Sequence, residues 1–304
     1  MDRNGASLLF EIGRENMKII DTHLHLWDLS KCRLPWLSEE FAILKRNFDL
    51  TDYLAEIDSK EFEIEQAVYI EVDAAPEDTK KENKWVHTLL SEPNIVTGSI
   101  LKMDLLAADI DDQLQAYSKE GAKGVRHVLH TSDSAPGTCL HPMFQANMHK
   151  LGENNLLFEA CMRTNELADL VVLAKECPGT TIVLNHCGNI DCNLLADNEV
   201  TVEEEALVKQ WRRQMSELGR LENVVCKLSG LNVENPASLD QLVDILLDNF
   251  SHDKIVFGGN YPVCLLNQGL SEWLQLVKSS LDRKNVTLQQ KIFYENAKKI
   301  YQLE

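Results

Sequence analysis

The chain has 304 residues, of which 44% are hydrophobic and 26% are charged, and its formal net charge is −18. This composition is typical of a folded globular protein, and the acidic balance argues against nucleic-acid binding and against adhesion to anionic membranes. The eight cysteines are scattered without a Cys-x-x-Cys pair, and no apolar run approaches the ~18 residues of a membrane span. Since no hydrophobic signal segment is recognisable either, we expect a reduced, cytoplasmic protein.

Residues 1–16 differ in character from the rest of the chain, and Met17 stands directly before the first predicted strand. We expect residues 1–16 to be an irregular leader and residues 17–304 to form a single domain. No Pro-rich or Ser-rich linker divides that domain.

Eight short apolar segments predict β-strands, and amphipathic stretches between and after them predict helices. The predicted strands are 18–27, 66–72, 95–101, 124–129, 156–161, 181–186, 223–228 and 254–259. The predicted helices are 51–58 (with Thr51 as N-cap), 77–91, 109–120, 142–153, 166–177, 203–221, 239–249, 269–281 and 288–301.

This alternation is typical of an α/β fold with a parallel sheet. Eight strands close a barrel of ~250 residues, so we predict a single distorted (β/α)8 TIM-type barrel with extra C-terminal helices. A doubly wound open sheet is the alternative, but no Gly-x-Gly-x-x-Gly follows the first strand.

Such barrels carry their chemistry at the C-terminal ends of the strands. The polar residues at the predicted strand ends are His23, His25, Glu71, Lys102, Arg126, His127, Glu159, His186, Lys227, Ser229 and Asn260. Charged side chains are rarely buried without partners, so we expect these residues to converge on one mouth of the barrel.

The first strand ends in a His-x-His pair. Because side chains alternate along a strand, His23 and His25 are expected to share one face with Asp21. Two imidazoles in one small volume can bind a metal ion or polarise a carbonyl group. The alternative is a pair of core histidines that bond to the backbone.

Six blocks of sequence follow one another along the chain. They are Ile20-Asp-Thr-His-Leu-His-Leu-Trp-Asp, Pro35-Trp-Leu, Lys123-Gly-Val-Arg-His, Leu184-Asn-His-Cys-Gly, Asn223-Val-Val-Cys-Lys-Leu-Ser-Gly-Leu and Phe257-Gly-Gly-Asn-Tyr-Pro-Val-Cys. Taken together, these blocks resemble the amidohydrolase-related sugar lactonases, the group of fuconolactonase, rhamnonolactonase and pyrone-dicarboxylate lactonase. The resemblance implies a distorted (β/α)8 barrel and hydrolysis of a cyclic ester. It also implies that His23, His25 and His186 hold or polarise the lactone carbonyl, with or without a divalent metal. Arg126 would then meet an oxygen-rich substrate through its planar fork of donors.

The chain departs from the pattern of this family at two places. The metal-dependent members supply a further His from strand five and a bridging Lys or Glu from strand four, which this chain lacks. We therefore expect either no required metal or a single weakly held divalent ion such as zinc, bound by His23 and His25.

The second departure is Asn260, which stands where the family usually has the Asp that deprotonates the attacking water. An amide orients water but has no useful basicity near neutral pH. Three explanations of this Asn are open. A neighbouring His or Glu has taken over as the base, the protein has lost catalysis, or the sequence is a substituted form of an active enzyme. We favour an active enzyme in which water held by Asn260 is deprotonated by His23 or His186.

The remaining candidates have both functional and structural interpretations. Trp27, Trp36 and Tyr261 are expected to stack on a sugar ring or to belong to the core around the mouth. Glu71 and Lys227 are predicted to bind substrate, yet Glu71 and Glu159 are equally suited to ion pairs with Arg126 or Lys227 inside the barrel. The other histidines, His127, His130, His141, His149 and His252, are expected on loops and helix surfaces.

The function that we predict is that of an intracellular hydrolase in carbohydrate catabolism that opens a sugar (aldono-)lactone to its hydroxy-acid. The alternatives are a metal-dependent decarboxylase or hydratase of the same superfamily, and a non-catalytic protein that binds sugar acids. A small molecule is the expected partner, with no nucleic acid and no membrane, and a homo-oligomer stays open.

Overall fold

The computed structural model describes residues 16–197 and 199–304. The predicted leader, residues 1–16, lies outside the described residues except for Asn16. Eight strands form one sheet, in which each strand pairs in parallel with the next strand of the chain. They are β1 (Met17–Leu24), β2 (Phe62–Ile70), β3 (Val96–Lys102), β4 (Gly124–Arg126), β5 (Leu157–Ala160), β6 (Ile182–Leu184), β7 (Val224–Ser229) and β8 (Ile255–Gly258).

The segments at the ends of β1 and β8 meet and complete the barrel. The backbone N–H of Asn260 donates to the carbonyl of His23 over 2.8 Å, and that of His25 donates to the carbonyl of Tyr261 over 2.8 Å. The predicted distorted (β/α)8 barrel with extra C-terminal helices is thus confirmed.

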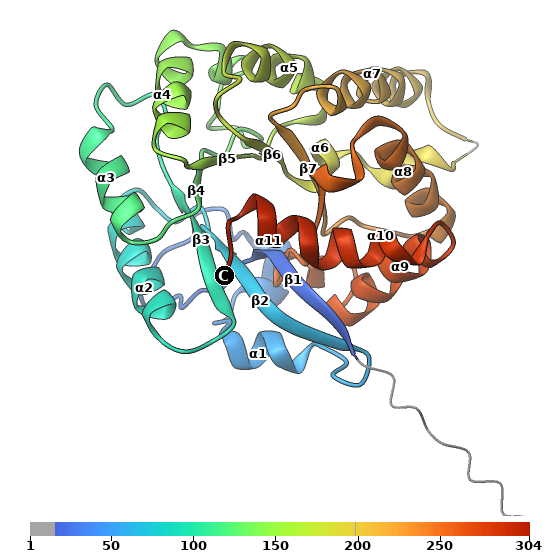
Figure 1. The fold of residues 1–304 in the computed structure, drawn as a ribbon, viewed down its shortest axis with the longest axis horizontal. Helices are drawn as coiled ribbons and strands as arrows, with labels where there is room; N and C mark the ends of the chain where they lie inside the picture. Colours follow the sequence, from blue (N-terminus) through green and yellow to red (C-terminus); the bar gives the residue numbers. More distant parts are fainter. Residues whose placement is uncertain (1–15, 198) are drawn as a thin grey trace, which may run out of the picture.

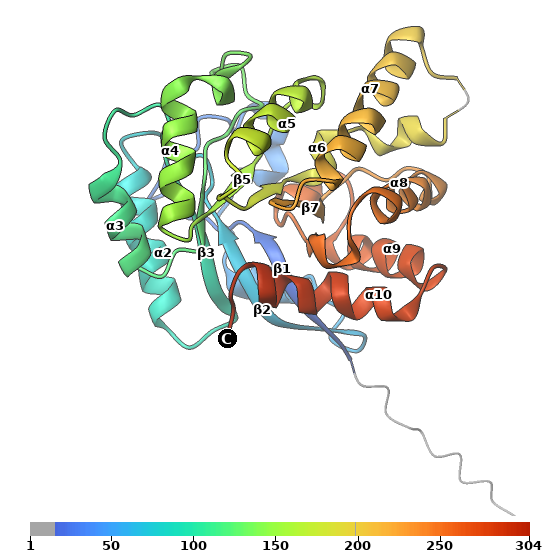
Figure 2. The ribbon, with the colours of Figure 1, turned by 45° about the horizontal axis from the view of Figure 1, so that its top comes forward.

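Most of the helices cover the outside of the barrel (Figures 1 and 2). In chain order, the helices are α1 (Leu50–Ala55), α2 (Thr79–Ser91), α3 (Asp111–Lys119), α4 (Pro142–Glu153), α5 (Leu167–Glu176), the short α6 (His186–Asn189), α7 (Val202–Gly219), α8 (Pro236–Asn249), α9 (Leu270–Asp282), α10 (Val286–Gln290) and α11 (Asn296–Ile300). A π-helical turn, Lys291–Glu295, joins α10 to α11 where the sequence predicted one continuous helix.

The start of α1 differs from its prediction. Asp49, not Thr51, is the N-cap, because its carboxylate accepts from the backbone N–H groups of Thr51 and Asp52. The side chain of Asp52 accepts in turn from the backbone of Asp49, which completes a capping box.

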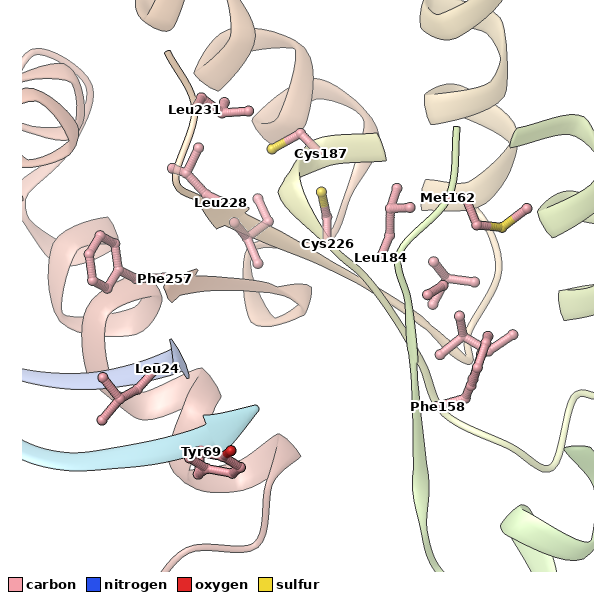
Figure 3. Close-up of a cluster of buried hydrophobic side chains, with 14 of the residues drawn as sticks. Leu24, Tyr69, Phe158, Met162, Leu184, Cys187, Cys226, Leu228, Leu231 and Phe257 are labelled. Atoms are coloured by element: carbon pink, nitrogen blue, oxygen red, sulfur yellow. The ribbon is translucent and has the colours of Figure 1, made fainter. Parts of the chain in front are cut away.

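The apolar side chains of the strands form two layers. One layer packs between the barrel and the surrounding helices, and Figure 3 shows part of it, with Phe158, Leu184, Cys226, Leu228 and Phe257 from neighbouring strands. The other layer fills the barrel interior together with the C-terminal segment, and consists of Ile20, Val68, Ile70, Ile100, Leu157, Val183, Val225, Val256, Ala297, Tyr301 and Leu303. The C-terminal segment therefore closes the N-terminal end of the barrel, where Figure 1 shows α11 across the centre of the ring of helices.

The alternation of β1 is not regular, as its register against β2 shifts between Asp21 and Leu24. The Asp21 carboxylate accepts from Tyr53 of α1 and from the backbone N–H of Gly259, so it points out of the barrel toward the helices. The prediction that Asp21 shares a face with His23 and His25 is therefore wrong.

All eight cysteines are free and buried, as expected of reduced core thiols. None of the helices in the described part of the chain combines the length and the apolar character that crossing a membrane requires.

Candidate active site

A cavity of about 610 Å³ opens at the C-terminal mouth of the barrel. Its wall is built from residues at or just beyond the strand ends, as the barrel architecture predicts. They include His25, Asp73, Arg126, His130, Cys161, His186, Gly230 and Asn260, with Trp36 and Phe41 from the connection after β1.

The predicted site residues divide into two groups. His25, Arg126, His186, Asn260 and Trp36 lie on the cavity wall. The other five lie behind that wall, and they are His23, Glu71, Lys227, Trp27 and Tyr261.

His23 of β1 and His25, just beyond its end, take part in a series of hydrogen bonds. His25 Nδ1 lies 2.9 Å from the Ile70 carbonyl and must carry the proton to bond it. His25 Nε2 is then an acceptor, and it lies 3.2 Å from His23 Nε2. His23 Nδ1 lies 3.4 Å from the ammonium of Lys227, which donates to it. The series thus runs from Lys227 through His23 and His25 to the Ile70 carbonyl, and neither imidazole keeps a nitrogen for a ligand.

The imidazoles of His23 and His25 are both neutral. Burial, followed by the charge of Lys227, holds the pKa of His23 well below its usual value. Burial, followed by the charge of Arg126, does the same to the pKa of His25. The predicted direct contact of His23 and His25 with a substrate carbonyl is therefore not supported by their bonding.

A divalent metal fits these donors poorly. In the described ranges, no cluster of three or more His, Cys, Asp or Glu side chains is arranged to hold a metal ion. His23 Nε2 carries the proton that it donates to His25, and metal binding there would move that proton to Nδ1, which faces the Lys227 ammonium. The donor set is thus arranged for a hydrogen-bonded pair.

His186 is the imidazole that remains available. It begins α6 with a φ of 50°, and the next three residues also have positive φ, so the chain turns sharply at the end of β6. His186 Nδ1 lies 2.7 Å from Ser229 Oγ, and among the described residues no group bonds its Nε2. Burial, followed by the charges of Arg126 and Lys227, lowers the pKa of His186 to about 3. Such a group is a poor base, but with Ser229 donating to Nδ1 it presents a neutral N–H to the cavity.

Arg126 forms an ion pair with Glu71 at the cavity wall. Its Nε donates to Glu71 Oε1, and its Nη2 donates to the Glu71 carbonyl over 2.7 Å. Glu71 Oε2 accepts from the backbone N–H of Asp73, so the carboxylate is fully used. The ion-pair alternative for Glu71 is confirmed, and its predicted contact with substrate is wrong, because Glu71 lies behind Arg126 and has no exposed surface.

Lys227 and Glu159 form a second ion pair, 2.8 Å long, deeper in the barrel. Lys227 also donates to the Thr22 carbonyl, and Tyr301 donates to Glu159 from the C-terminal segment. Neither charged side chain is exposed, so the predicted contact of Lys227 with substrate is wrong and its ion-pair alternative is confirmed.

Of the three predicted aromatic residues, only Trp36 lines the cavity. Its Nε1 donates to the Val72 carbonyl over 2.8 Å, which fixes the ring in the wall. Trp27 donates to the Arg46 carbonyl, and Tyr261 packs edge-to-face against Phe48, so both belong to the core around the mouth.

Asn260 follows β8 with a φ of 56° and is 7% exposed. Gly230, at the end of β7, packs directly against it, and a Cβ at Gly230 would come within 2.3 Å of the Asn260 Cβ. The amide is therefore held in the wall by a close approach that only glycine permits.

The sequence reasoning missed several wall residues, among them His130 and Cys161. His130 lies on the loop after β4, as expected, but its contact was not foreseen: its Nδ1 lies 3.2 Å from the Sγ of Cys161, and both residues line the cavity. The available signal was the position of these residues just after two consecutive strands, β4 and β5.

Comparisons with known proteins agree with this architecture. A family model described as "Amidohydrolase" matches residues 20–303. An L-fucono-1,5-lactonase of Burkholderia multivorans is 23% identical over 85% of this chain and 87% of its own length. An L-rhamnono-gamma-lactonase of Scheffersomyces stipitis is 24% identical over 94% of this chain and 99% of its own.

Solved structures share the fold. An amidohydrolase from Burkholderia multivorans with bound zinc superposes with a TM-score of 0.81 at 20% identity, covering 95% of this chain and 100% of its own. A probable 2-pyrone-4,6-dicarboxylic acid hydrolase from Acinetobacter baumannii with bound citric acid gives 0.73 at 16% identity, covering 94% and 100%.

Proposed function

The chain belongs to the amidohydrolase family, and from that premise we propose that it is a hydrolase that opens a cyclic ester, an aldonolactone, to the hydroxy-acid. Relatives named L-fucono-1,5-lactonase and L-rhamnono-gamma-lactonase support this choice of substrate class. We propose that this reaction belongs to carbohydrate catabolism in the cytoplasm. We also propose that residues 17–304 form the single domain that carries it out.

The observation that carries the proposal is the content of the cavity wall. It combines a guanidinium, a neutral imidazole with a free nitrogen, an amide and an indole around about 610 Å³. This volume suits a small ligand, and the polar groups suit one that carries several oxygens. A lactone offers a carbonyl for the imidazole, hydroxyl groups for the guanidinium, and a ring face for the indole.

Each wall residue then has a role. Arg126 orients the substrate through the guanidinium edge that Glu71 leaves free. His186 donates from Nε2 to the carbonyl and stabilises the oxyanion that forms there. Asn260 orients the water that ends in the product. His23 and His25 act as positioning residues, whose hydrogen-bond chain fixes the wall next to His186.

No step of this proposal passes through a metal. If zinc were bound, His23 and His25 would supply its nitrogen ligands, and the ion would polarise the carbonyl. The bonding of His23 to Lys227 opposes that arrangement. The same observation disfavours a metal-dependent decarboxylase or hydratase.

One observation favours a second candidate function. Because Asn260 replaces the usual Asp, the cavity also suits a protein that binds sugar acids without turning them over. Arg126 would then pair with the ligand carboxylate.

A pH-indicator assay separates the two functions, since ring opening releases one proton. The panel consists of the 1,4- and 1,5-lactones of L-fuconate and L-rhamnonate, each corrected for spontaneous opening. We expect turnover of at least one lactone, and a loss of ~10²-fold in kcat for His186→Ala, as expected for an oxyanion donor. Calorimetric binding of the free acids without turnover of any panel lactone would instead establish a binding protein.

A further inference from the structure

Cys161 and His130 form a pair that the roles above do not use. Cys161 follows β5 and His130 follows β4, and Sγ and Nδ1 are 3.2 Å apart. Both residues line the cavity that holds Arg126, His186 and Asn260. The pair therefore has the geometry of a nucleophile next to a base, and it lies where a ligand binds.

The surroundings favour the charged form of this pair. The Nδ2 group of Asn189 lies 3.8 Å from Sγ as a second donor. Burial alone would raise the pKa of Cys161, but the proximity of His130 and the charge of Arg126 outweigh it and lower that pKa. Cys161 in turn raises the pKa of His130, which favours the thiolate–imidazolium form of the pair.

Two other cysteines show what is particular to Cys161. Cys177 lies 3.9 Å from His149 Nε2, but away from the cavity wall, and burial raises its pKa to about 11. Cys192 lies on the wall, but its thiol donates to the Asn232 carbonyl, and burial raises its pKa to about 12. Only Cys161 among the described cysteines combines the wall, a His partner and an extra donor.

Resting on the lactone-opening function above, we propose that Cys161 is the nucleophile that opens the ring and that His130 is its proton partner. This assignment also accounts for Asn260. A direct attack by water needs a base, and neither Asn260 nor the weakly basic His186 supplies one. A thiolate attacks without that base, and the neutral amide adds no negative charge beside the developing oxyanion.

The Cys161 thiolate attacks the lactone carbonyl carbon, the ring C–O bond breaks, and the leaving alkoxide takes the proton of the His130 imidazolium. The product of this step is an open-chain hydroxyacyl thioester on Cys161. Water then attacks the thioester carbonyl and gives one proton to the neutral His130, while the C–S bond breaks and the thiolate leaves. The hydroxy-acid is released, and the thiolate–imidazolium pair is restored.

Kinetics of matched Cys→Ser variants test the proposal. Cys161→Ser keeps a hydrogen-bond donor, but its hydroxyl is a much weaker nucleophile than a thiolate. We therefore expect a loss of ~10²-fold or more in kcat on the panel lactones. Cys177→Ser removes a buried cysteine that also has a His neighbour, and we expect wild-type kinetics. Circular dichroism and thermal melts establish that both variants fold.

Two measurements report on the thiol itself. Intact-mass spectrometry of His130→Asn, quenched in acid with a panel lactone, should show an adduct of the whole lactone mass, because ring opening loses no atoms. Peptide mapping should place it on Cys161. Iodoacetamide on the wild-type protein should alkylate Cys161 at least tenfold faster than Cys177 or Cys192.

The outcomes separate the two proposals. Turnover by the wild type with less than threefold loss in Cys161→Ser would overturn the nucleophile and leave the lactonase standing. Equal alkylation of Cys161 and Cys177 would also overturn it. If no panel lactone turns over in the wild type, both proposals fall together.

Discussion

Two buried ion pairs lie next to each other in the barrel, and they differ in what they leave free. In the inner pair, Lys227 donates to Glu159, to the Thr22 carbonyl and to His23, so all three of its protons are used. In the outer pair, Arg126 donates to Glu71 through one edge and lines the cavity with the rest of its guanidinium. A buried cation with no spare donor belongs to the scaffold, whereas one with spare donors is available to a ligand.

The strongest way to break this comparison is Lys227→Met. The change leaves Glu159 as an uncompensated buried carboxylate, for which the expected loss in free energy of unfolding is ~3–5 kcal/mol. Urea denaturation of the variant measures it. Adding Glu159→Gln should restore part of the loss, since that removes the unpaired charge. A loss below ~1 kcal/mol, the range of exposed pairs, would show that the inner pair is not part of the scaffold.

The outer pair is tested by Arg126→Lys. Lysine keeps the charge but cannot bond Glu71 and a ligand through separate edges, so we expect KM to rise ~10-fold and kcat to change less. Steady-state kinetics on the panel lactones measure both. Arg283→Lys, at an exposed pair with Asp240, is the matched control and should change neither. Unchanged KM in Arg126→Lys would make the outer pair as structural as the inner one.

Asn260→Asp adds a carboxylate to the cavity wall that also holds Arg126 of the outer pair. We expect kcat to stay flat or to fall a few-fold, because the new charge opposes the oxyanion. Initial rates on the panel lactones decide the matter. A gain of ~10²-fold or more would point to general-base catalysis by the new carboxylate and against the thiol route.

The smallest effect is expected from chelation. Because Lys227 keeps His23 bonded through Nδ1, prolonged dialysis against EDTA should change kcat less than twofold. Elemental analysis before and after dialysis provides the control. Loss of activity that zinc restores would show that the inner pair does not keep a cation from His23 and His25.

The sequence predicted the parts of the site that follow from barrel geometry. Arg126, His186 and Asn260 stand at strand ends, so the (β/α)8 architecture alone brings them to one mouth. It did not predict His130 and Cys161, whose meeting depends on how the connections after β4 and β5 fold. Which indole reaches the cavity, Trp36 or Trp27, is likewise decided within the connection after β1.

The roles of His23 and His25 could not be predicted from the sequence, for a different reason. Two histidines that alternate on a strand are equally compatible with a metal and with a hydrogen-bonded pair. The choice depends on a third residue, Lys227, more than 200 positions away in the sequence, whose Nζ lies 3.4 Å from His23 Nδ1. The irregular register of β1 likewise depends on tertiary contacts, because it is linked to the hydrogen bonds of Asp21 with Tyr53 and Gly259.

The closed N-terminal end of the barrel limits how ligands enter and leave the cavity. Ala297, Tyr301 and Leu303 fill the interior below the ion pairs, so within the described residues the cavity opens at the mouth alone. A ligand must therefore enter and leave through the same opening, whose wall includes Arg126. Product and incoming substrate therefore exclude each other, and inhibition by the product acid should be competitive.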